Sequence, residues 1–326
     1  MRELTFAQAV REALAEEMRR DPSVFVIGED VGEAGHPFKV LAGLIDEFGP
    51  ERVVDTPISE AGITGIAVGA AMTGLRPVVD IMFGDFLTLA MDQLVNQAAK
   101  IHYMSGGKLR VPLVVHTTLG ATRRSAAQHS QSLHAWFSHV PGLKVALPAT
   151  PRDAKGLLKA AIRDDSPVVV FEDKMTYQLR GPVPEGEFVI PLGVAEVKRE
   201  GTDVTVVATS SMVAVALATA DLLEAEGISL EVVDPRTTVP LDRETLVASA
   251  AKTGRVIVVD EGCRSYGVTA ELASVIAEEA FYHLDAPVRR LGAMDVPVPF
   301  SPVLEDLTVP TPETVAAAAR ELLGKA

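Results

Sequence analysis

Asp55-Thr56-Pro57-Ile58-Ser59-Glu60-Ala61-Gly62 places a carboxylate, that of Glu60, at the point where a strand stops and a helix starts. The apolar run 52–55 predicts the strand, and Pro57 takes the chain out of the sheet because proline has no N–H to donate. The run 61–72 predicts a helix whose small residues let another backbone or a flat ligand approach closely. Two interpretations of Glu60 stay open. It is either an acid in the first turn of a helix that Ser59 caps, or a carboxylate that serves a binding site.

Composition predicts a globular chain of two domains, because the protein has 326 residues of which 48% are hydrophobic and 23% are charged. A net charge of -14 argues against a nucleic-acid partner, since phosphate binding needs a basic face. The N-terminus leads into an amphipathic helix without a signal-peptide core, and no apolar run is long enough to span a membrane. We therefore expect a cytoplasmic protein. Its one cysteine, Cys263, excludes an internal disulfide, and we expect it to be an ordinary packing residue.

Apolar runs that resemble buried strands alternate with helical patterns along the first part of the chain. Such alternation predicts an α/β fold with a mainly parallel sheet flanked by helices, and ligands then bind beyond the carboxyl ends of the strands. Glu60, Phe86 and His129 all follow predicted strand ends. The predicted strands are 24–30, 52–55, 77–81, 111–116, 143–147 and 167–171, and the clearest helices are 6–18, 86–104 and 151–163.

A proline-rich segment, residues 181–195, lacks periodicity and predicts a linker between two domains. The first domain is then 1–180. The second is 196–326, a shorter α/β unit with valine-rich strands. We expect its strands at 204–208, 228–233 and 256–260, and its helices to start near Met212, Leu241, Val268 and Thr311.

Standard chemical motifs are almost absent. No phosphate-binding loop or Gly-x-Gly-x-x-Gly follows the first strand, so nothing indicates that this chain holds a nucleotide alone. His129, His134 and His139 recur every five residues, and on a helix that spacing turns successive rings by about 140°, which is too far to share one metal ion. The remaining candidates are the carboxylate of Glu60, the aromatic Phe86 and the histidine His129.

Seven short motifs of the first domain, in order along the chain, carry a resemblance to a known family. They resemble the β subunit of the thiamine-diphosphate-dependent dehydrogenases, which act on pyruvate, branched-chain 2-oxo acids or acetoin. The resemblance implies a transketolase-type pyrimidine-binding domain followed by a transketolase-type C-terminal domain. The motifs are Asp55–Glu60, Gly74–Pro77, Asp92-Gln93 with Ala98–Lys100, Tyr103–Gly107, Gln128–Ser132, Pro141–Val145 and Asp153–Leu158.

The resemblance gives each of the three candidate residues a role. Glu60 matches the catalytic glutamate that hydrogen-bonds a ring nitrogen of the cofactor's aminopyrimidine and favours its imino tautomer. Phe86 matches an aromatic that lies against the pyrimidine ring, although it could equally be a core residue. His129 matches a catalytic histidine that faces the reacting centre and the incoming lipoyl group. Its alternative role is to orient a loop.

In the enzymes that this chain resembles, a Gly-Asp-Gly motif and a downstream asparagine hold the magnesium ion that anchors the cofactor's diphosphate, and this chain lacks that pair of features. Its single asparagine is Asn96, with no such motif before it. We therefore expect magnesium to be held by an α subunit, thiamine diphosphate to be shared with it, and an assembly of two α and two β chains. The helices after Glu60 and Phe86 are candidates for the subunit interfaces.

The resemblance also implies two weaker features. Some relatives bind potassium through backbone carbonyls at positions that match Leu113, Ala161, Ile162, Asp164 and Ser166. The C-terminal domain matches the part that contacts a lipoyl-bearing acyltransferase, and Arg264 and Glu261 are candidates for that surface, or solvated loop charges.

Substrate choice depends on a few residues. Ala135-Trp136-Phe137, Glu172–Met175 and Tyr177 resemble the acetoin and pyruvate members, and acetoin is the first choice. The loop 120–127 also resembles the acetoin members, while the role of Arg123 and Arg124 stays open. Two alternatives remain, a non-catalytic scaffold subunit of the same fold and a transketolase-type enzyme component.

Overall fold

The computed structural model describes residues 1–325, and the chain divides into two compact units. The first unit comprises Met1–Leu119 and Trp136–Leu192, and the second comprises Gly120–Ala135 and the chain from Gly193 onward. The sequence suggested a single boundary near 181–195. The structure adds a short excursion, because Gly120–Ala135, the segment that carries His129, packs with the second unit. The expected linker also begins within a strand, β8 (Arg180–Val183), which pairs with β1 (Arg2–Thr5).

The first unit is built on a parallel sheet whose strands follow the order β6-β7-β5-β4-β2-β3. Nearly half of their residues are valine or isoleucine, which suits strands that helices cover on both faces. The α/β fold expected from the sequence is therefore confirmed. The strands are β2 (Val24–Gly28), β3 (Val53–Asp55), β4 (Arg76–Ile81), β5 (Val114–Leu119), β6 (Lys144–Ala146) and β7 (Val168–Asp173).

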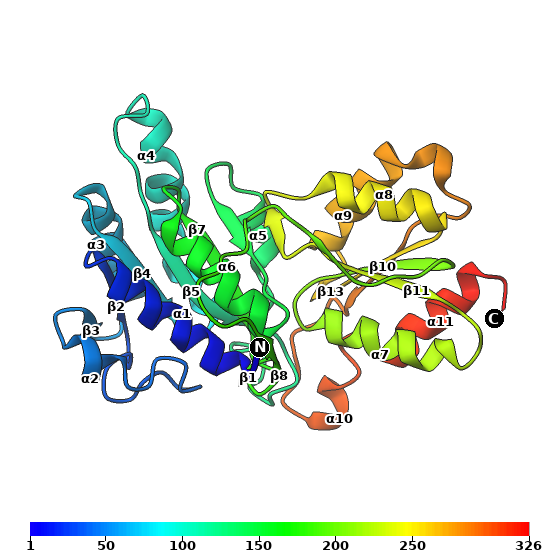
Figure 1. Cartoon of the computed structure of the whole chain (residues 1–326), viewed down its shortest axis with the longest axis horizontal. Helices are drawn as coiled ribbons and strands as arrows, with labels where there is room; N and C mark the ends of the chain where they lie inside the picture. The colour runs from blue at the N-terminus through cyan, green and yellow to red at the C-terminus, as the bar shows by residue number, and fades with distance from the viewer. Residues whose placement is uncertain (326) are drawn as a thin grey trace. The chain divides into compact units, whose positions relative to one another are not determined.

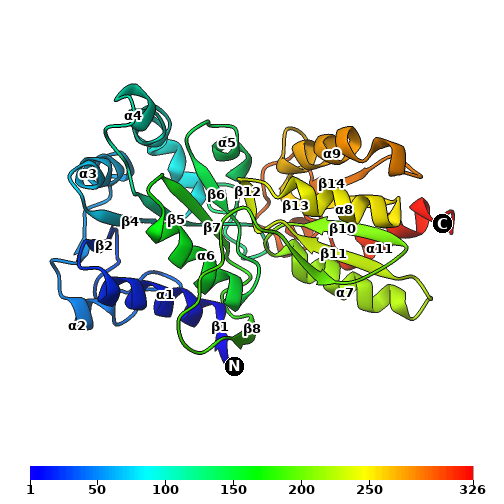
Figure 2. The same ribbon diagram turned by 45° about the horizontal axis from the view of Figure 1, so that its top comes forward.

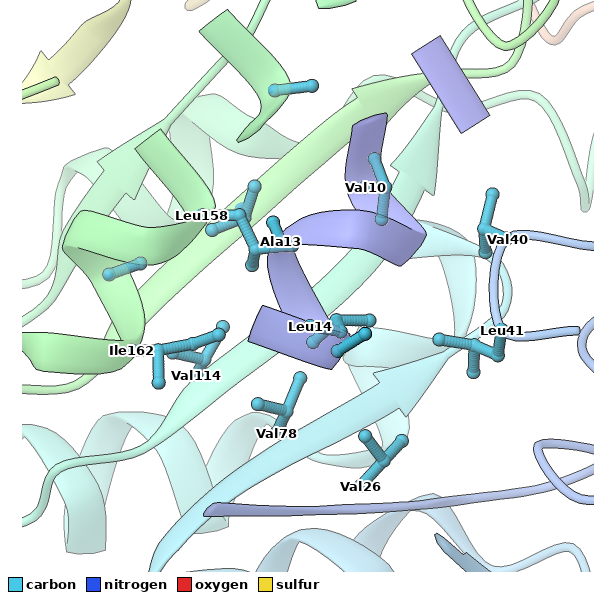
Figure 3. Close-up of a cluster of buried hydrophobic side chains, with 14 of the residues drawn as sticks. Val10, Ala13, Leu14, Val26, Val40, Leu41, Val78, Val114, Leu158 and Ile162 are labelled. Atoms are coloured by element: carbon cyan, nitrogen blue, oxygen red, sulfur yellow. The ribbon is translucent and has the colours of Figure 1, made fainter. Parts of the chain in front are cut away.

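Helices α1 (Phe6–Arg20) and α6 (Pro151–Arg163) pack side by side on one face of this sheet (Figure 1). Thr5 caps α1 through a reciprocal capping box with Gln8, as its sequence predicts. Apolar residues at helical spacing meet valines from the strands, and Figure 3 shows this core around Leu14, Leu158 and Val114. The remaining helices of this unit are α2 (Leu44–Phe48), α3 (Glu60–Met72) and α4 (Ala99–Met104); α5 (His134–Ser138) lies where the two units join in sequence.

The single helix predicted over 86–104 is wrong. The structure has a 3-10 helix, η1 (Gly84–Leu89), then a π-helical stretch, η2 (Gln93–Ala98), and only then α4. At Gly84 the chain passes so close to β5 that an added Cβ would lie 2.6 Å from the carbonyl oxygen of Thr118. This tertiary contact holds the segment in a tight turn, and apolar periodicity along the chain does not reveal it.

The second unit has a sheet of order β14-β13-β10-β11-β9, parallel except for the antiparallel edge strand β9. Helices α7 and α11 pack together on one face, and α8 and α9 on the other (Figures 1 and 2). The strands of this sheet are β9 (Glu196–Arg199), β10 (Val204–Ala208), β11 (Leu230–Asp234), β13 (Val256–Cys263) and β14 (Arg289–Ala293); the short strand β12 (Thr237–Val239) is not part of it. The helices are α7 (Met212–Glu224), α8 (Arg243–Thr253), α9 (Val268–Glu279), η3 (Phe281–His283), α10 (Pro302–Glu305) and α11 (Pro312–Leu322).

Cys263 is exposed at the end of β13, so the expectation that it is an ordinary packing residue is wrong. Cys263 is the last residue of the strand and follows the buried part of β13, which explains the difference.

Across residues 1–325, no helix combines the length and the apolar character needed to cross a membrane.

Candidate functional site

Glu60 is the first residue of α3 and follows the carboxyl end of β3, as the sequence predicts. Ser59 occupies the N-cap position but makes no side-chain cap bond. The hydroxyl oxygen of Ser59 lies over Gly62, where an added Cβ would come within 2.7 Å of it, so a larger residue there would require this hydroxyl to turn away. The Glu60 side chain is half-buried.

Three other acids lie near Glu60 at the carboxyl ends of β2 and β3. The pKa of Glu29 is raised, first by burial and then by the negative charges of Asp30, Glu60 and Asp55. Asp55 accepts a hydrogen bond of 2.9 Å from the backbone N–H of Val31. A cluster of like charges favours a ligand that brings a proton or a positive charge. An N–H donor on a heterocyclic ring is such a ligand, so the residues at this point fit the pyrimidine end of thiamine diphosphate.

Phe86 comes from η1, which packs against α3. Its backbone N–H donates to the carbonyl of Phe83 at 2.9 Å, and the two rings meet edge to face with centroids 6.0 Å apart. The Phe86 ring is half-buried and so keeps part of its surface accessible. Glu60 and Phe86 thus come from two packed elements of the first unit.

His129 lies in the second unit, on the irregular segment between β5 and α5. Its backbone N–H donates to the carbonyl of Ala126 at 3.4 Å, and the side chain is half-buried. His134 is buried instead and lies 3.1 Å from the carboxylate of Asp260. The two histidines therefore have separate environments.

A buried cluster of charged residues in the first unit was missed by the sequence analysis. His116 on β5 lies between two carboxylates, with Nδ1 2.6 Å from Asp80 on β4 and Nε2 2.9 Å from Glu172 on β7. All three side chains are at most 2% exposed. The only sequence signal is a polar residue within, at the end of or directly after each of three apolar runs, and cross-strand register is needed to see that these residues meet.

Its two carboxylate neighbours keep His116 protonated at neutral pH. Burial by itself would lower its pKa, but the charge of Glu172 and hydrogen bonds to Asp80 and Glu172 outweigh burial and raise the pKa to about 10. Burial lowers the pKa of the neighbouring His36, whose Nε2 is 3.5 Å from Asp80. The Tyr177 hydroxyl is fully buried near Glu172, and burial raises its pKa well above the usual value.

Aromatic rings connect this ionic cluster with Phe86. Phe83 contacts Phe86, and Phe38 contacts Phe83 with centroids 6.1 Å apart. Phe38 also stacks on Tyr177 at 5.1 Å and contacts His36 at 5.5 Å. A path of ring contacts thus runs from Phe86 through Phe83 and Phe38 to His36.

Four of the five carbonyls expected to bind potassium already accept hydrogen bonds. Arg76 donates through Nη1 to the carbonyls of Ile162 and Asp164, each at 3.0 Å. The carbonyl of Ala161 accepts from the N–H of Asp164 at 3.2 Å, and that of Leu113 accepts from Val168 at 2.9 Å. Because a guanidinium already supplies positive charge here, these residues fit a further cation poorly, and we derive no step through potassium.

The residues of both units match known family models. The model described as "Transketolase, pyrimidine binding domain" matches residues 2–180, and "Transketolase, C-terminal domain" matches 193–315. The fold and the site thus define a chain built from transketolase-type domains. A solved structure titled "Split gene transketolase, inactive beta4 tetramer" is similar over 98% of each chain, with a TM-score of 0.81 and 27% identity.

Curated relatives define the family more narrowly. The β subunit of acetoin:2,6-dichlorophenolindophenol oxidoreductase from Bacillus subtilis is 48% identical, over 99% of this chain and 98% of its own. The pyruvate dehydrogenase E1 component β subunit of Rickettsia felis is 47% identical, over 98% of each chain. The 2-oxoisovalerate dehydrogenase β subunit of Bacillus subtilis is 46% identical, over 98% of each chain. The chain belongs to the family of β subunits of acetoin and 2-oxo acid dehydrogenases.

Proposed function

We propose that this chain is the β subunit of a thiamine-diphosphate-dependent dehydrogenase that cleaves a carbon–carbon bond next to a carbonyl and passes the acyl group to a lipoyl domain. The observation that carries the proposal is the half-buried carboxylate of Glu60 at the start of α3, among three other acids. Family membership at 46–48% identity over nearly the full chain supports it. It is favoured over a scaffold role because a scaffold has no need for clustered negative charge at the start of α3, an element that packs against the one that carries the half-buried Phe86 ring.

Each candidate residue has one task in this proposal. Bound thiamine diphosphate supplies the carbon nucleophile and accepts the electrons of the broken bond. Glu60 accepts a hydrogen bond from a ring nitrogen of the pyrimidine and holds the shared proton. Phe86 offers its accessible surface to the same ring, and His129 is the group that moves a proton at the reacting carbonyl or the lipoyl sulfur.

An α subunit completes the site and holds the magnesium ion, in an assembly of two α and two β chains. Large apolar side chains around α3 and after η2 support such interfaces, because Ile58 is 70% exposed, Ile66 62% and Tyr103 87%. A lipoyl-bearing acyltransferase as the next partner, a cytoplasmic location, and potassium at Leu113, Ala161, Ile162, Asp164 and Ser166 remain predictions. Arg76 argues against the potassium site.

Cofactor binding tests the shared site. We expect the purified chain alone to bind thiamine diphosphate and magnesium at least about 100-fold more weakly than the α/β assembly does, because the diphosphate and metal ligands come from the partner. Calorimetric titration of both preparations measures the difference. Tight magnesium-dependent binding by the β chain alone would contradict a divided site.

Substrate preference is the second test. We expect the α/β assembly to use acetoin with the highest kcat/KM, pyruvate less well, and a branched 2-oxo acid least, measured with an artificial electron acceptor. The motifs around Trp136 and Tyr177 are the basis of this order. A preference for the branched acid would reject it while leaving the thiamine chemistry intact.

A further inference from the structure

The segment Gly120–Ala135, here called the His129 loop, has a strained backbone. Three of its non-glycine residues are left-handed, with φ of 66° at Thr122, 59° at Arg124 and 61° at Ala126. L-residues rarely adopt this conformation because Cβ then crowds the following carbonyl oxygen, and a β-branched threonine is an especially unusual choice for it. Such strain persists only where the surrounding structure determines the conformation, and it is frequent at functional sites.

Arg124 attaches this loop to two carboxylates at the end of α10 and just after it. Its guanidinium lies 2.7 Å from Glu305 and forms a two-point contact with Asp306 at 2.7 and 3.0 Å. The backbone N–H of Arg124 donates to the same Glu305 carboxylate at 3.2 Å. Glu305 is fully buried at the end of α10, so little water can solvate its carboxylate. The negative charge of Glu305 is therefore compensated mainly by the Arg124 guanidinium. The arginine that the sequence left without a role is therefore an internal anchor.

Two more carboxylates hold the ends of the loop. Glu261, which is 7% exposed, accepts hydrogen bonds from the backbone N–H of Ala121 and from the hydroxyl of Ser211. At the other end, Asp260 accepts from His134 at 3.1 Å and from the N–H of Gly262 at 2.7 Å. Glu261 thus has hydrogen-bond partners within the second unit. Contact with an acyltransferase, for which the sequence made Glu261 a candidate, is not needed to explain this carboxylate.

We propose that Glu305 and Arg124, together with Glu261, are positioning residues that hold the His129 loop in its strained conformation so that His129 is presented to the reacting group. His129 lies between the Arg124 anchor and the His134 anchor, and its backbone bonds to Ala126, one of the three strained residues. The inference rests on the proposed function, because it explains the strained backbone by the role of His129 in the proposed reaction.

The test compares Glu305→Gln and Arg124→Met with wild type in the complete α/β assembly. Because about 1 Å of misplacement can cost 10²-fold in rate, we expect kcat for acyl transfer to a lipoyl domain to fall about 10- to 100-fold in both. The affinity for thiamine diphosphate should stay within twofold, because Glu60 and Phe86 belong to the other unit. Arg124→Lys should recover part of kcat, since lysine keeps the charge but cannot form the two-point contact.

A direct probe of the loop does not depend on turnover. Glu305→Gln leaves the loop sequence unchanged, so faster tryptic cleavage at Arg123 or Arg124 in this variant reports a loosened loop. Arg199→Met is the matched control, because Arg199 also pairs with two carboxylates, Asp221 and Glu224, but lies outside the loop. Unchanged cleavage and unchanged kcat in folded Glu305→Gln would overturn the proposal, and so would an equal loss of kcat in Arg199→Met. Loosening of the loop with normal kcat would also overturn it, whereas a wild-type assembly without turnover would instead count against the proposed function.

Discussion

Glu60→Gln is expected to lower turnover of the α/β assembly by about 10²- to 10⁴-fold, the usual range for loss of a general acid–base group. Glutamine has almost the same size as glutamate and can begin α3 equally well, but its amide oxygen cannot hold the shared proton. The variant also removes one negative charge from a cluster that raises the pKa of Glu29. We therefore expect loss of activity without loss of stability.

Glu51→Gln is the matched control, since Glu51 is an exposed acid shortly before β3. Both variants should sediment as the same assembly as wild type and show melting temperatures within about 2 °C of it. Steady-state kinetics and pre-steady-state consumption of acetoin or pyruvate then measure the chemical step. Unchanged turnover in Glu60→Gln would favour the scaffold alternative.

The position of Glu60 was predictable because it depends on local sequence. An apolar strand, a proline that ends it and a run of small helix formers fix the strand-to-helix junction without knowledge of the rest of the fold. The same holds for the start of α6, where Thr150 caps and Pro151 is the first residue. Signals of this kind act over a few residues and can be identified from the sequence alone.

Other features depend on contacts between distant segments. The break in the helix predicted at 86–104 comes from close contact of Gly84 with Thr118, and the conformation of the His129 loop comes from carboxylates more than a hundred residues later. No feature of the amino-acid composition indicates that Gly120–Ala135 packs with the second unit. Neither periodicity nor motif spacing carries such information.

His116→Leu tests the buried ionic cluster and should destabilise the protein by about 3–5 kcal/mol, the usual cost of leaving a buried charge unpaired. In this variant Asp80 and Glu172 face each other without the cation between them. The double variant Asp80→Asn/His116→Leu should recover part of the loss because one unpaired charge is removed. His283→Leu is the control, since His283 is exposed. Urea denaturation of all four proteins measures the differences.

The pH dependence separates the charge of His116 from its packing. The pKa of His116 is about 10 in the folded protein, against an ordinary value of 6.5 in the unfolded chain. A raised pKa stabilises the folded state fully below pH 6.5, and the contribution declines as the pH rises from 6.5 through 10. Asp80, whose pKa is lowered by His36 and His116 in spite of burial, stays ionised across this range. The unfolding free energy of wild type should therefore decline from pH 6.5 to pH 10, whereas no decline over this range would mean that His116 acts only by filling space.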